Sequence, residues 1–145
     1  DDGAVLAVPA AHELVVCTDT LVEGVHFPVR TDAADLGWKS LAVNLSDLAA
    51  MGATPAWATL ALTLPEANAT WVEAFADGFA ALAREHKLAL VGGDTTRGPL
   101  TITVTAHGFV PAGAALVRAG ADLEAKVEGK TAREVALARR LERRR

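Results

Sequence analysis

The chain has 145 residues and a mass of 15.0 kDa, the size of one ordinary domain with a short extension. Hydrophobic residues make up 51% of it, but charged residues interrupt every apolar run before the roughly 18 residues that a membrane span needs, which argues against a membrane protein. Residues 1–117 hold 5 Lys and Arg against 13 Asp and Glu, and residues 118–145 hold 9 Lys and Arg against 5 Asp and Glu. The acidic charge of residues 1–117 argues against nucleic acid as the main partner and suits cations or metal-bound phosphates.

The first predicted elements are a strand and a helix. Residues 13–20, ELVVCTDT, are rich in β-branched side chains and are typical of a buried strand that ends near Asp19. The single Cys17 in this strand excludes an intramolecular disulfide and fits the reducing cytoplasm. Asp32 then opens a helix that Gly52 closes. Its apolar stripe consists of Leu36, Trp38, Leu41, Ala42, Leu45, Leu48 and Ala49, and its polar face of Ser40, Asn44 and Asp47.

Residues 53–65 form a continuous apolar run between prolines and predict a second long strand. Thr70 and Glu73 form a capping-box pattern before a core-facing helix that ends near His86. Residues 88–95 indicate a short strand that ends in a glycine turn. Residues 100–109 alternate between apolar and polar side chains, which predicts a half-buried antiparallel strand.

This order of elements predicts an α/β domain of the α+β type. We expect a mixed, mainly antiparallel four-stranded sheet that helices cover on one face, which leaves the other face open for a partner. From Gly120 the composition changes, and residues 122–145 are expected to form a basic helical tail.

The candidate site residues are carboxylates near strand ends or on the polar helix face. They are Asp1, Asp2, Asp19, Asp47 and Asp94. Hard cations such as Mg²⁺ prefer carboxylate oxygens and share their remaining positions with water and substrate phosphates. The alternative for each Asp alone is that it caps a turn or a helix.

Two further stretches have a weaker functional signal. In VGGDTTRG, residues 91–98, the two glycines let backbone N–H groups approach an anion, which favours a phosphate site beside Asp94. A simple turn is the alternative. His26 lies in a polar, glycine-containing loop and suits a phosphate contact, although a structural role accounts for it equally well.

Long segments of the chain, in the same order, resemble the N-terminal half of the bacterial thiamine-monophosphate kinase family over residues 1–121. They are the initial DD, CTDTLVEGVHF, DLGWKSLAVNLSDLAAMGATPAW, LALTLP, VGGDTTRGPLTITVTAHGFVP and GAALVRAGA. The family belongs to the superfamily of aminoimidazole ribonucleotide synthetase and selenophosphate synthetase. The resemblance implies ATP-dependent phosphorylation of thiamine phosphate to thiamine diphosphate by direct transfer with several Mg²⁺ ions.

The resemblance also implies roles for individual residues. The family's Mg²⁺ ligands correspond to Asp2, Thr18, Asp19, Asp47 and Asp94. Its nucleotide-binding residues correspond to Gly93, Asp94 and Arg118, and its substrate-contacting histidine to His26. A homodimer is implied in which the open sheet faces of two chains close into a barrel, with Trp57 near the contact.

The chain departs from the family after residue 121, where family members continue into a second domain that supplies further site residues. Residues 1–121 are therefore expected to form the ATP-, Mg²⁺- and dimer-forming domain, and residues 122–145 an atypical tail. The alternative is a dimerisation module or scaffold, truncated or engineered from that family, that has no turnover. Another metal-dependent phosphotransferase of the same superfamily is a third interpretation.

Overall fold

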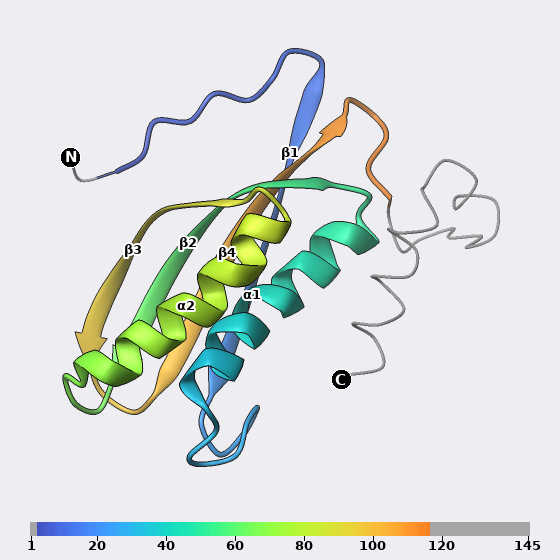
Figure 1. Ribbon diagram of the computed structural model, residues 1–145. Helices are drawn as coiled ribbons and strands as arrows, with labels where there is room; N and C mark the ends of the chain where they lie inside the picture. Colours follow the sequence, from blue (N-terminus) through green and yellow to red (C-terminus); the bar gives the residue numbers. More distant parts are fainter. Residues whose placement is uncertain (1–2, 117–145) are drawn as a thin grey trace.

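The computed structural model describes residues 3–116. Along this part of the chain the elements are β1 (His12–Val22), α1 (Ala33–Ala50), β2 (Thr54–Leu64), α2 (Ala69–Glu85), β3 (Ala89–Arg97) and β4 (Thr101–Pro111). The strands form one sheet in the order β1-β4-β2-β3, in which β2 and β3 pair in parallel and the other neighbours are antiparallel. Both helices lie on one face of the sheet (Figure 1). The predicted α+β fold with a mixed four-stranded sheet is confirmed.

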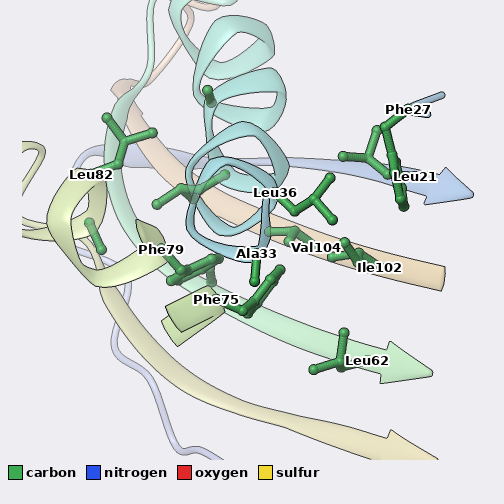
Figure 2. Packing of buried hydrophobic residues seen from close by; sticks show 14 of the residues in the cluster. Leu21, Phe27, Ala33, Leu36, Leu62, Phe75, Phe79, Leu82, Ile102 and Val104 are labelled. Carbon is green, nitrogen blue, oxygen red and sulfur yellow. The ribbon is translucent and has the colours of Figure 1, made fainter. Parts of the chain in front are cut away.

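The hydrophobic core lies between the two helices and this face of the sheet. Figure 2 shows Phe75 and Phe79 of α2 beside Leu36 of α1, over Ile102 and Val104 of β4. Every second residue of β4 is buried from Ile102 onward, as the alternating sequence predicts. Because this burial removes apolar area from water, it is the main force that holds the helices on the sheet.

Two glycines let the helices approach each other closely. A Cβ atom at Gly37 of α1 would lie 2.0 Å from the carbonyl oxygen of Phe75, and one at Gly78 of α2 would lie 1.9 Å from that of Ala34. Side chains larger than hydrogen therefore do not fit at either position without moving one helix.

The helix starts agree with the prediction at α1 and differ at α2. The Asp32 carboxylate accepts hydrogen bonds from the backbone N–H groups of Ala34 and Asp35, so Asp32 is the expected N-cap of α1. At α2 the N-cap is Asn68, whose side-chain oxygen accepts from the N–H of Trp71 at 3.1 Å. The predicted capping box at Thr70 is therefore wrong, because an amide two residues earlier satisfies the first turn.

Ser40 and Asn44 were expected on the polar face of α1, opposite its apolar stripe, but both are buried. Their exposed fractions are 1% and 0%. The Ser40 hydroxyl donates to the carbonyl oxygen of Gly37 at 2.9 Å, and the Asn44 amide donates to that of Ser40 at 3.0 Å. Because helix carbonyls accept these donors, both polar groups are buried with hydrogen-bond partners.

The predicted glycine turn after residue 91 is also wrong, because β3 continues through both glycines to Arg97. Its residues 92–97 pair in parallel with residues 59–64 of β2. The parallel ladder therefore continues past the point where the glycine pair suggested a turn.

The face of the sheet away from the helices is lined by threonines and aromatic side chains. The hydroxyl groups of Thr18 and Thr105 lie 2.9 Å apart, as do those of Thr20 and Thr103. Trp57 packs edge-to-face on Phe109, with ring centroids 4.9 Å apart. We call the surface formed by β1, β4 and β2 on this side the open face.

Some sequence-based predictions concern parts of the chain that the structure does not describe. The domain boundary at residue 121 and the basic helical tail at 122–145 lie outside the described residues. Neither α1 nor α2, the helices of the described part, has the length and apolar content that crossing a membrane requires.

Candidate active site

Two of the predicted metal ligands, Asp19 and Asp47, lie near the Cys17 thiol on the helix side of the sheet. Cys17 projects from β1 toward α1, where its Sγ atom lies 3.4 Å from the carbonyl oxygen of Asn44 and 3.7 Å from the Asn44 side-chain oxygen. Asp19 follows two residues later on the same strand and therefore shares this face. Asp47 follows Asn44 by one helical turn on α1.

The electrostatics of Cys17 support this placement of the two carboxylates. Burial, the largest cause, acts together with the negative charges of Asp47 and Asp19 to raise the pKa of the Cys17 thiol to about 11. Backbone hydrogen bonds with Ala106 and Leu48 act in the opposite direction. Carboxylates from β1 and α1 thus both act on the same thiol.

Thr18 and Asp94 are placed differently from this pair. Thr18 lies on the open face, where it contacts Thr105. In the sheet, Asp94 of β3 pairs with Ala61 of β2, and Ala61 pairs with Thr103 of β4. Asp19 of β1 pairs with Val104 of β4. Since Thr103 and Val104 are consecutive in a strand, the register assigns Asp94 and Asp19 to opposite faces.

Within residues 3–116 no group of three or more His, Cys, Asp or Glu side chains is arranged to hold a metal ion. Asp2, Arg118 and Asp1 lie outside the described residues. The described part therefore places Asp19 and Asp47 near the same thiol, and the register places Asp94 on the opposite face of the sheet. The donors present, carboxylate and hydroxyl oxygens, are those that Mg²⁺ prefers.

Gly93 is required by the close approach of β3 to β2. A Cβ atom there would lie 1.9 Å from the carbonyl oxygen of Leu60, and its φ of +156° is one that residues with side chains rarely adopt. A Cβ at the preceding Gly92 would meet nothing within 4 Å. The Asp94 side chain accepts a hydrogen bond from the N–H of Thr95 at 2.9 Å.

His26 lies in the loop that joins β1 to α1. Its side chain is exposed, while the next residue, Phe27, is 4% exposed and belongs to the core. Its Nδ1 atom accepts a hydrogen bond from the N–H of Val22 at 3.0 Å. Its carbonyl oxygen accepts a hydrogen bond from the ammonium group of Lys39 on α1 at 2.7 Å.

Sequence reasoning did not single out Lys39 as a contact of this loop, nor Asn44 as a contact of Cys17. The helical period assigns Asn44 to the polar face of α1, so no local signal marked its contact with Cys17. For Lys39 no local pattern marks a partner 13 residues earlier.

Comparison with known families identifies the domain. The family described as AIR synthase related protein, N-terminal domain, matches residues 1–110. The chain belongs to this family. Among its AIR synthase related relatives is the thiamine-monophosphate kinase of Salmonella typhimurium, 59% identical over 121 residues, which are 83% of this chain and 37% of that protein. The enzyme of the same name from Bacillus subtilis is 38% identical over 122 residues, covering 81% of this chain and 38% of that protein.

Solved structures agree with this assignment. A thiamine-monophosphate kinase from Stenotrophomonas maltophilia has a TM-score of 0.79 and 66% identity, over 81% of this chain and 37% of that one. A structure named AaThiL, complexed with AMPPCP and TMP, has a TM-score of 0.74 and 29% identity, over 97% of this chain and 52% of that one. The chain thus spans 37% of the length of its Salmonella relative.

Proposed function

We propose that this chain carries the N-terminal half of the active site of a cytoplasmic kinase that transfers a phosphoryl group from ATP to thiamine phosphate and so makes thiamine diphosphate. The main support is the structure of a relative with bound ligands. AaThiL, whose fold matches 97% of this chain, was solved with AMPPCP, an ATP analogue, together with TMP. The 59% identity to the Salmonella thiamine-monophosphate kinase supports the same substrates.

Phosphoryl transfer needs positioning and charge neutralisation rather than a protein nucleophile, and the proposed roles follow from this chemistry. Gly93, Asp94 and Arg118 would bind ATP, and His26 would contact thiamine phosphate. The oxygen donors of the site would hold Mg²⁺, namely those of Asp2, Thr18, Asp19, Asp47 and Asp94. When bound, Mg²⁺ would neutralise the charge of the phosphates.

The described residues contribute specific properties to this chemistry. Asp19 and Asp47 approach from different elements, so a cation between β1 and α1 would hold the helix on the strand as well as bind phosphate. Gly93 lets β3 lie against the Leu60 carbonyl, which fixes the backbone on which Asp94 is mounted. His26 presents an exposed ring whose Nδ1 accepts a hydrogen bond from the Val22 N–H, while its backbone carbonyl accepts one from Lys39.

We further propose that two copies associate through the open face. Its threonine pairs and the Trp57–Phe109 contact lie on β1, β4 and β2. Leu14 and Val16 at its β1 side are 42% and 52% exposed. A second copy would cover these side chains, and a two-fold contact places the same surface on both partners.

A coupled assay of thiamine diphosphate formation tests the kinase proposal. We would assay the chain with MgATP and thiamine phosphate, alone and with the C-terminal part of the Salmonella relative added. Asp47→Asn is the test variant, and Asp77→Asn, which alters an exposed α2 carboxylate, is the matched control. We expect turnover to fall at least about 100-fold in Asp47→Asn, as for loss of charge stabilisation in a transfer site, and to persist in Asp77→Asn.

The same assay separates the kinase from the alternative, a dimerisation module without turnover. No turnover in either arm, together with no Mg²⁺-dependent ATP binding by calorimetry, would leave the dimerisation module as the better account.

A further inference from the structure

The loop at residues 22–27, which we call the His26 loop, has a defined conformation. The N–H groups of Val25 and His26 both donate to the carbonyl oxygen of Val22, at 3.2 Å and 2.9 Å. The N–H of Gly24 donates to the carbonyl oxygen of Phe27 at 2.8 Å, and the Phe27 side chain is buried in the core. The backbone that carries His26 is therefore fixed, although its ring is exposed.

The hydrogen bond from Val22 determines which nitrogen of the His26 ring carries the proton. Nδ1 accepts the Val22 N–H at 3.0 Å, and a nitrogen that accepts a hydrogen bond carries no proton of its own. The neutral ring is therefore protonated at Nε2. An exposed Nε2–H in a fixed ring is a suitable donor to a phosphate oxygen.

Lys39 fixes the same loop from the helix side. Its ammonium group lies 2.7 Å from the His26 carbonyl oxygen, a short distance that is typical of a charge-assisted hydrogen bond. Holding a flexible Lys side chain in one conformation costs entropy, so the contact has to be favourable to persist. Val22 thus holds the ring and Lys39 holds the backbone of one residue.

We infer that Lys39 is a positioning residue for the phosphate group of thiamine phosphate, because it holds His26 so that Nε2–H points to that phosphate. The inference rests on the proposed function for the substrate and on the two hydrogen bonds for the geometry. Lys39 acts through His26, so it is not a catalytic residue.

Calorimetric titration of the chain with thiamine phosphate and, separately, with MgATP tests this role. The variants are Lys39→Met, Lys39→Arg, His26→Ala and the double variant, with Arg84→Met as a control that removes an exposed cation from α2. We expect Lys39→Met to weaken thiamine phosphate binding about tenfold, the size of effect known for groups that orient a ligand-binding side chain, and to leave MgATP affinity unchanged. Lys39→Arg should restore most of the affinity, and Arg84→Met should match the parent chain.

The double variant distinguishes positioning from direct contact. If Lys39 acts through His26, the double variant binds thiamine phosphate no more weakly than His26→Ala alone. Additive losses would mean that Lys39 contacts the phosphate itself and would overturn the inference. Equal thiamine phosphate affinity in Lys39→Met and the parent chain would also overturn it.

A spectroscopic measurement keeps the test independent of the proposed function. The ¹⁵N chemical shifts of the imidazole, assigned with His26→Ala, should show a protonated Nε2 in the parent chain and a mixture of tautomers in Lys39→Met. If the parent chain binds no thiamine phosphate, the proposed function fails for this chain. The ¹⁵N shifts then decide by themselves whether Lys39 positions the His26 ring. Identical shifts in both proteins would then refute the positioning role.

Discussion

Cys17 of β1 contacts α1 through polar atoms. Its thiol faces the Asn44 carbonyl group and lies near two carboxylates, so a negative charge on sulfur would be poorly stabilised there. The thiol is consequently protonated at neutral pH and is a weak nucleophile. A serine at this position would offer a similar size with a stronger hydrogen-bond donor.

The reactivity of Cys17 should follow its raised pKa. We expect iodoacetamide to modify the folded chain slowly at pH 8 and to react half-maximally only near pH 11, and Asp47→Asn to lower that midpoint because one negative charge is removed. Mass spectrometry of the alkylated chain measures the rate. A midpoint near the ordinary cysteine pKa of about 8.5 would contradict the environment described for the thiol.

The same pKa shift predicts how stability depends on pH. As pH rises, the unfolded chain loses the Cys17 proton first, because the folded thiol holds its proton more tightly. The stabilisation is complete below about pH 8.5, the unfolded pKa, and is lost as pH rises through about 11. Urea unfolding between these values should show this decline in the parent chain and a smaller one in Cys17→Ser.

The glycine pair of β3 provides a matched test at neighbouring positions. Gly93→Ala would place a methyl group against the Leu60 carbonyl, whereas Gly92→Ala would meet open space. We expect Gly93→Ala to lower the free energy of unfolding by about 1–3 kcal/mol, the usual cost of overpacking, and Gly92→Ala to change it little. Urea denaturation measures both, and equal effects would refute the close contact between β2 and β3.

At the scale of elements, the packing of α1 on α2 determines how the helices cover the sheet. Gly37 and Gly78 let the two helix backbones lie close together. The buried side chains of Ser40 and Asn44 donate hydrogen bonds to carbonyl oxygens of α1, so these donors are satisfied inside the helix. Because Lys39 and Asp47 are on this helix, its position also determines where two proposed site residues lie.

Substitution of the helix glycines tests this contact. Alanine favours a helix over glycine by about 1 kcal/mol, yet we expect Gly78→Ala to destabilise the chain, because its Cβ would collide with the Ala34 backbone. Gly37→Ala should behave alike. The double variant should cost less than the sum of the two single costs, because helices already separated by one methyl group tolerate the second. Thermal unfolding measures all three, and a stabilised Gly78→Ala would refute the close approach.

At the scale of the whole molecule, the sheet has helices on one face only. The open face exposes Leu14 and Val16, carries the half-buried aromatic pair of Trp57 and Phe109, and holds threonine hydroxyls that pair with one another. Burial of this face against a second copy, as proposed above, would remove its apolar side chains from water.

A charge in the middle of the open face should prevent the proposed association. Thr59 of β2 pairs with Thr105, which lies on the open face. We expect Thr59→Arg to convert a dimer to a monomer in light-scattering measurements, because two desolvated guanidinium groups would meet at a two-fold contact. Ala76→Arg places the same charge on the exposed surface of α2 and should leave the dimer intact. A parent chain that is monomeric at the highest concentration tested would contradict the association.

The sequence by itself determined the elements and most of their buried faces. The alternation in β4 and the leucine stripe of α1 were readable because the periods of strands and helices are local properties of the chain. The N-cap at Asp32 was readable for the same reason, since it lies beside the N–H groups that it satisfies. The motifs also pointed to the family to which the domain belongs.

The tertiary structure decided what depends on contacts between distant segments. Asp19 and Asp94 look alike as acidic residues near strand ends, but the strand register assigns them to opposite faces. The sequence likewise did not predict the contact of Asn44 with Cys17 or the contact of Lys39 with the His26 loop. The physical reason is that register and helix docking are set by packing energies summed over the whole core, which no single stretch of residues encodes.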